Sequence, residues 1–151
     1  MQRSKTEIYL HFVWATHRRL PLITPALEPQ LYEVLTEQAQ RLGCQVLALG
    51  GVSDHVHLVV CTPSKRAPFE IAKQLKGASS AWVRRHIRPQ QPISAEPFGW
   101  QDNYACFSLS RTHLKQAIYY VTHQQQHHAE QKLWPDWEET HQEVTEQPAE
   151  N

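Results

Sequence analysis

The sequence lacks any long apolar segment. Hydrophobic residues make up 40% of its 151 residues, yet no run approaches the roughly 20 residues that a membrane-spanning helix needs. Residues 1–7 are polar and charged, and no apolar signal-peptide core follows them. These absences argue against a membrane protein and a secreted precursor, so we expect a soluble cytoplasmic protein with no membrane partner.

Cysteine is also scarce. The three cysteines, Cys44, Cys61 and Cys106, lie far apart and form no Cys-x-x-Cys pair. Neither a cysteine zinc site nor a disulfide framework is therefore indicated. Because free cysteine is among the most buried residue types, each is expected to be a reduced core residue.

The chain has no net charge, but its charges are unevenly distributed. Residues 1–129 hold 14 Lys and Arg against 8 Asp and Glu, whereas residues 130–151 hold one Lys against 7 Asp and Glu. We therefore expect one basic domain over 1–129 and an acidic tail over 130–151. A basic body suits a polyanionic partner, although solubility alone also explains a balance this small.

Hydrophobic periodicity predicts four strands and three helices. We expect strands at 7–14, 44–50, 55–61 and 104–109, and helices at 26–42, 68–87 and about 111–128. Gly50-Gly51 and Ser53-Asp54 are predicted to form the turn of a hairpin. This order predicts a ferredoxin-like (RRM-like) α+β fold: a four-stranded antiparallel sheet with two helices on one face. We expect the C-terminal helix, which is additional to this fold, to hold residues with an added function.

His55 and His57 flank Val56 on a predicted strand. Side chains alternate along a strand, so the two imidazoles should converge on one face while Val56 packs on the other. This arrangement suits two adjacent ligands of a divalent metal. A bare His-x-His is common, and two ordinary surface histidines are the alternative.

Tyr120 and Gln124 lie four residues apart on the last predicted helix, so they share a face. Gln124 can offer a carbonyl oxygen to a metal, and Tyr120 can present its phenol beside it. A polar helix surface is the alternative. Tyr119, with His123 four residues later, is a rival nucleophile.

These side chains together fit one reaction. A phenol, with a pKa of about 10, is a poor nucleophile at neutral pH, but a metal on the scissile phosphate would stabilise the developing charge. The product would be a covalent phosphotyrosine. Two histidines and one amide leave coordination positions open, so Mg²⁺ or Mn²⁺ is favoured over a structural Zn²⁺ with four ligands.

Five segments resemble, in matching order, the HUH single-tyrosine transposases, which comprise small insertion-sequence transposases and repeat-associated tyrosine transposases. The segment 51–60 resembles the His-hydrophobe-His motif of that family, and 100–110 resembles the strand before its catalytic helix. The segment 120–128 resembles the catalytic helix itself, usually Tyr-Ile-x-Asn-Gln-x-x-His-His. Segments 12–19 and 75–79 match as well. The resemblance covers about residues 7–129.

The resemblance implies His55 and His57 as metal ligands, Gln124 as the third ligand and Tyr120 as the nucleophile. Tyr120 is preferred over Tyr119 because only Tyr120 stands four residues before the matching Gln. The sequence departs from the usual pattern at His123, where Asn is usual, and at Ser53, where Pro is common. The implied activity is metal-dependent cleavage and rejoining of single-stranded DNA through a 5′-phosphotyrosine.

Candidate phosphate contacts follow from the positions of the basic residues, although a solvated surface explains any one of them equally well. They are Arg18, Arg19, Lys73, Lys76, Arg84 and Arg85, with Arg88 nearby. The resemblance implies single-stranded DNA, with a hairpin, as the partner. We also expect a homodimer.

Two alternatives to an active transposase are open. A domesticated repeat-associated relative would carry the same active site but would not move its own gene. A non-catalytic nucleic-acid-binding module would share the sheet, since fold alone does not fix function. That second alternative leaves the His-x-His and Tyr-x-x-x-Gln pairs unexplained.

Overall fold

The computed structural model describes residues 4–129, so the acidic tail expected at 130–151 lies outside the described residues. One four-stranded sheet has the order β2-β3-β1-β4, and every neighbouring pair is antiparallel. The strands are β1 (Tyr9–Ala15), β2 (Gln45–Val52), β3 (His55–Cys61) and β4 (Ala105–Leu109). The helices are α1 (Glu28–Arg41), α2 (Pro68–His86), α3 (Leu114–Thr122) and α4 (Gln124–Ala129), with 3-10 turns η1 (His17–Arg19), η2 (Arg88–Gln90) and η3 (Arg111–His113).

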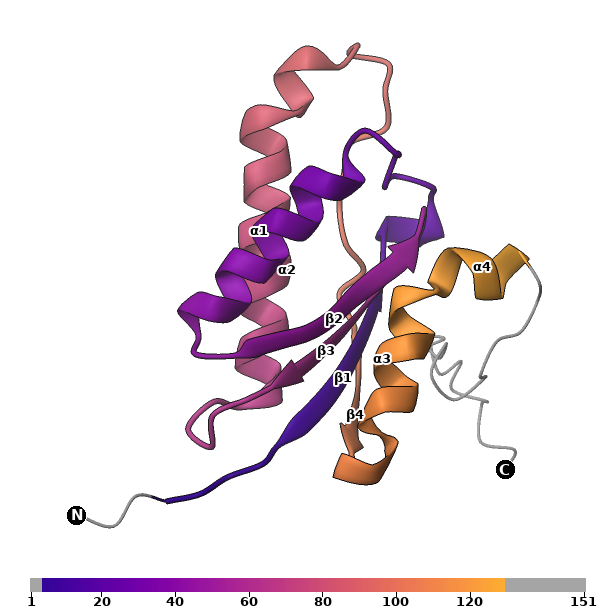
Figure 1. The fold of residues 1–151 in the computed structure, drawn as a ribbon. Helices are drawn as coiled ribbons and strands as arrows, with labels where there is room; N and C mark the ends of the chain where they lie inside the picture. Colours follow the sequence, from indigo (N-terminus) through magenta and orange to yellow (C-terminus); the bar gives the residue numbers. More distant parts are fainter. Residues whose placement is uncertain (1–3, 130–151) are drawn as a thin grey trace, which may run out of the picture.

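The helices lie on both faces of this sheet. The pair α1 and α2 covers one face, and α3 with α4 lies against the other (Figure 1). The predicted ferredoxin-like α+β fold with an added C-terminal helical segment is confirmed. Among residues 4–129, no helix combines the length and apolar character that crossing a membrane requires.

Alternation along the strands divides the apolar residues between two cores. The larger core, under α1 and α2, includes Phe12, Trp14, Val56 and Leu58. The smaller core, under α3, is built from Ala48, Val59, Ala117, Tyr120 and Val121. Because it is small, the α3 face has room for buried polar groups between helix and sheet.

The prediction that Gly50 and Gly51 belong to the hairpin turn is wrong, since both lie within β2 and only Ser53-Asp54 forms the turn. Gly50 pairs with His57 on β3, and a Cβ added to Gly50 would lie 2.0 Å from the carbonyl oxygen of Val121. Gly50 therefore allows the backbone of α3 to approach the sheet directly beside His57.

The prediction of one continuous helix over 111–128 is also wrong. The segment begins with η3, and His123, with φ −111° and ψ 26°, separates α3 from α4. The Thr122 hydroxyl donates to the Ile118 carbonyl at 2.9 Å, a contact that often bends helices. The Gln124 side-chain amide donates to the Tyr120 carbonyl at 3.1 Å, where a continuous helix would use a backbone N–H.

Candidate active site

His55 and His57 lie on the α3 face of β3, and both are buried. His55 is 1% exposed and His57 0%, and their ring centroids are 5.1 Å apart. Val56 packs in the opposite core. The predicted convergence of the two rings is confirmed, and the alternative of two surface histidines is wrong. Their role as metal ligands stays a prediction.

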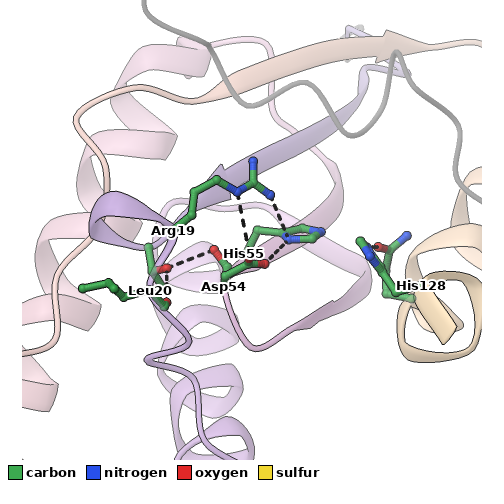
Figure 2. Close-up of polar contacts among 7 residues, drawn as sticks. Arg19, Leu20, Asp54, His55 and His128 are labelled. Atoms are coloured by element: carbon green, nitrogen blue, oxygen red, sulfur yellow. Dashed lines mark hydrogen bonds and ion pairs between the residues drawn. The ribbon is translucent and has the colours of Figure 1, made fainter. Parts of the chain in front are cut away.

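Asp54, at the end of the hairpin turn, contacts the first of these rings. Its Oδ1 atom lies 2.7 Å from Nδ1 of His55, and its Oδ2 atom lies 3.7 Å from Nε of Arg19 (Figure 2). The hydrogen bond from His55, with the nearby positive charge of Arg19, holds the pKa of the Asp54 carboxyl below its usual value despite partial burial. Asp54 is therefore a carboxylate that accepts the Nδ1 proton of His55.

Arg19 lies close to the same histidine, with Nη2 3.5 Å from His55 Nδ1. A guanidinium can only donate a hydrogen bond, so a bond from Arg19 would need a lone pair on His55 Nδ1, whereas a bond to the Asp54 carboxylate needs a proton there. One nitrogen cannot offer both. We therefore assign the Nδ1 proton to the shorter bond, that to Asp54. Arg19 then places a positive charge beside the histidine pair.

The second ring of the pair contacts a third histidine from the adjacent strand. Nδ1 of His57 lies 2.9 Å from Nε2 of His11 on β1, and both side chains are fully buried. Each candidate ligand ring therefore uses Nδ1 for a contact inside the protein. When Nδ1 of such a ring carries the proton, Nε2 is the nitrogen through which it would bind a metal.

The helical segment presents its two neighbouring tyrosines in opposite ways. Tyr120 is 1% exposed, and its ring meets that of His57 edge to face at a centroid distance of 5.9 Å. Tyr119 is 56% exposed and stacks on His123 at 3.9 Å. Only Tyr120 is thus brought to the histidine pair, and it is the same chain's His57 that it meets.

Gln124 is buried at the start of α4, and both ends of its amide have partners. Its Nε2 atom donates to the Tyr120 carbonyl at 3.1 Å, and its Oε1 atom lies 3.1 Å from Nε2 of His128. The His128 ring lies 4.9 Å from that of His55, and Figure 2 shows it facing His55 from α4. The amide is therefore oriented with its oxygen toward the histidine side.

The candidate donor residues fit a divalent cation only if the amide of Gln124 is included. Within residues 4–129, no three His, Cys, Asp or Glu side chains group as a metal site. The set proposed from the sequence has two such residues and Gln124, whose carbonyl oxygen is the third donor. Two imidazole nitrogens and one oxygen, all neutral, suit a divalent cation that keeps open positions.

The predicted DNA-contact residues fall into two groups. Arg18 and Arg19 lie in η1, both with positive φ (51° and 53°), next to the hairpin turn that carries Asp54. The other four lie on α2, on the face of the sheet opposite His55 and His57; they are Lys73, Lys76, Arg84 and Arg85. The structure therefore brings Arg19, but not the α2 residues, to the candidate site.

The sequence alone indicates no role at the site for three of its side chains. It predicts a turn position for Asp54, a strand position for His11 and a motif match for His128. A charged or imidazole side chain next to a ligand candidate, or inside an otherwise apolar strand, was the available signal. Sequence alone does not supply the strand register that makes them neighbours.

Comparison with known proteins places this arrangement in one family. The sequence profile of the family described as "Transposase IS200 like" matches residues 4–124. The ISDra2 transposase TnpA of Deinococcus radiodurans is 24% identical over 130 residues, which are 82% of this chain and 91% of that protein.

Two solved structures share the fold. One, assigned as a transposase from Deinococcus radiodurans R1, has a TM-score of 0.65 at 22% identity and covers 82% of this chain and 98% of its own. The other, a REP-associated tyrosine transposase bound to a REP hairpin, has a TM-score of 0.57 at 12% identity. The match covers 80% of this chain and 68% of that one. The resemblance found in five sequence motifs is confirmed, and the chain belongs to the IS200-like transposase family.

Proposed function

We propose that this transposase cleaves and rejoins single-stranded DNA through a 5′-phosphotyrosine on Tyr120, with a divalent metal as cofactor. The observation that carries the proposal is the burial of Tyr120 against His57, 5.9 Å between ring centroids, with Gln124 one turn further on. Tyr120 thus meets His57 between α3 and the sheet, and the amide oxygen of Gln124 lies 3.1 Å from Nε2 of His128, whose ring is 4.9 Å from that of His55. Hydrogen bonds with Asp54, His11 and His128 orient the two imidazoles and the amide.

The residues that would hold the metal are His55 and His57 through Nε2 and Gln124 through Oε1. Mg²⁺ or Mn²⁺ suits this neutral set, which leaves positions for phosphate oxygens and water. When bound, the metal would neutralise charge on the scissile phosphate and orient it for in-line attack. Asp54 and His11 would hold the ligand rings, and His128 the amide.

Tyr120 supplies the nucleophile in this proposal. Its phenolic oxygen attacks phosphorus and gives its proton to solvent water, a P–O bond to Tyr120 forms, and the bond from phosphorus to the 3′ oxygen breaks. The DNA segment on one side of the cut takes up a proton from water and ends in a free 3′-OH. The segment on the other side stays attached to Tyr120 through its 5′ phosphate. Attack by a 3′-OH on the phosphotyrosine reverses these steps and rejoins DNA.

Single-stranded DNA with a hairpin is the partner that we propose. Arg19, beside His55, would contact phosphates at the cleavage point, and Arg18 would contact the strand next to it. Lys73, Lys76, Arg84 and Arg85 on α2 lie on the opposite face, so any phosphates they contact belong to a distal part of the DNA. The homodimer, the cytoplasmic location and the domain boundary at residue 129 stay predictions.

Formation of a covalent adduct tests the proposed function. Purified protein is incubated with single strands from both flanks of its own gene, with Mn²⁺ or with EDTA, and the products are separated on a denaturing gel. A band of protein-linked DNA in Mn²⁺ only is expected. Strands that bind the protein yet give no adduct in Mn²⁺ would contradict the proposal.

Replacing Asp54 with asparagine is expected to lower the affinity for Mn²⁺ by about 10–100-fold, because an amide holds the His55 ring less firmly than a carboxylate. Mn²⁺ affinity can be measured by titration calorimetry on the DNA-free protein. Glu96→Gln is a matched control, since Glu96 pairs with Arg18 at 3.6 Å and does not contact His55. Equal affinities in wild type and Asp54→Asn would contradict the role given to this carboxylate.

A further inference from the structure

His11 lies at the centre of the sheet, on the face that carries the candidate site. It pairs with Val59 on β3 and with Phe107 on β4, while Val13, two residues further along β1, pairs with His57. His11 and His57 are therefore diagonal neighbours on one face, within reach of long side chains. Their ring centroids are 5.1 Å apart, and the His11 ring also packs on Phe107 at 6.0 Å.

The contact between the two rings is a buried hydrogen bond. His11 Nε2 and His57 Nδ1 are 2.9 Å apart, and both side chains are 0% exposed. Such a bond between neutral imidazoles has one donor and one acceptor, so the tautomer of one ring fixes that of the other. The two rings therefore form one coupled unit with two arrangements.

Only one of these arrangements allows His57 to bind a metal through Nε2. If His57 donates from Nδ1, its Nε2 carries no proton and can act as a metal ligand, and His11 carries its own proton on Nδ1. If His11 donates from Nε2, the proton of His57 must sit on Nε2, which then cannot coordinate. A metal-ligating histidine normally gives its other N–H to a protein acceptor in this way.

We propose that His11 is a positioning residue that accepts the Nδ1 proton of His57 and so holds His57 in its metal-binding tautomer. The inference deepens the proposed function and depends on its metal site. It gives the two ligands different partners: a carboxylate, Asp54, for His55 and a neutral imidazole for His57. A neutral partner orients the ring without adding negative charge to a site that must attract a phosphate.

Two substitutions at His11 separate its hydrogen bond from its bulk. Gln places a polar atom near the position of the His Nε2 atom and can accept from His57, whereas Met has a similar length and offers only a weakly accepting sulfur. We expect His11→Met to bind Mn²⁺ about 10–100-fold more weakly than wild type, and His11→Gln to stay within a few-fold of it. Thermal unfolding of the DNA-free proteins checks that each variant is folded.

The tautomer of His57 is measured directly in the metal-free wild type, from the ¹⁵N chemical shifts of its ring at a pH where the ring is neutral. A proton on Nδ1 of His57 supports the proposal, and a proton on Nε2 overturns it without need of any variant. Unchanged Mn²⁺ affinity in folded His11→Met also overturns it. Failure of wild type to bind Mn²⁺ at all would instead refute the metal site of the proposed function, a result that the tautomer measurement distinguishes.

Discussion

Replacing Tyr120 with phenylalanine is expected to abolish covalent attachment to single-stranded DNA and to lower cleavage by about 10³-fold or more, because it removes the attacking atom. The substitution keeps the ring, which meets His57 at 5.9 Å and stacks on His127 at 5.0 Å. Packing and Mn²⁺ affinity should therefore change little. The measurement is the adduct band on a denaturing gel in Mn²⁺, with strand cleavage followed in parallel.

Tyr119→Phe is the matched control for this experiment. It changes the adjacent residue by the same single oxygen, but the Tyr119 side chain is 56% exposed and stacks on His123, away from the histidine pair. Adduct formation should be unchanged in this variant. An adduct that survives in Tyr120→Phe and disappears in Tyr119→Phe would move the nucleophile to Tyr119.

Replacing Gly50 with alanine is expected to lower strand cleavage by about 10²-fold through displacement of α3, although Gly50 has no side chain of its own at the site. Its new Cβ would lie 2.0 Å from the Val121 carbonyl oxygen and 3.0 Å from the carbonyl carbon. Both are backbone atoms, so the helix must move away from the sheet and carry Tyr120 with it. Such overpacking also costs about 1–3 kcal/mol of stability.

Gly77→Ala provides the control for this second experiment. Gly77 lies inside α2, and apart from the backbone of its own helix a Cβ added there would have no atom of a more distant residue within 4 Å. Alanine in a helix is favoured over glycine by about 0.5–1 kcal/mol, so this variant should unfold at a higher temperature and cleave as well as wild type. Cleavage at the wild-type rate by folded Gly50→Ala would show that close approach of α3 does not position the tyrosine.

Much of the fold could be predicted because it depends on local periodicity. The alternation around His55, Val56 and His57 predicts both the strand and the direction of each side chain, and the structure agrees. The positions of Gly50 and Gly51 were predicted wrongly because glycine pairs usually mark turns. Here Gly50 lies within a strand, and its missing side chain allows α3, a helix more than sixty residues later in the sequence, to pack directly on that strand.

The candidate site was only partly predictable for a similar reason. The spacing of Tyr120 and Gln124 is local, but the break at His123 that lets Gln124 use its side chain on the Tyr120 carbonyl is not visible in helical periodicity. The contact of His11 with His57 depends on the register of β1 against β3. Register is a property of paired strands, so a single strand's sequence does not contain it.

The most direct test of the central claim is to locate the covalent bond. The adduct formed in Mn²⁺ is digested with nuclease and protease, and the peptide that retains a nucleotide is sequenced by mass spectrometry. The proposed mechanism predicts a 5′-phosphotyrosine on Tyr120 with a free 3′-OH on the released strand. A nucleotide on Tyr119 or on any residue other than Tyr120 would contradict it.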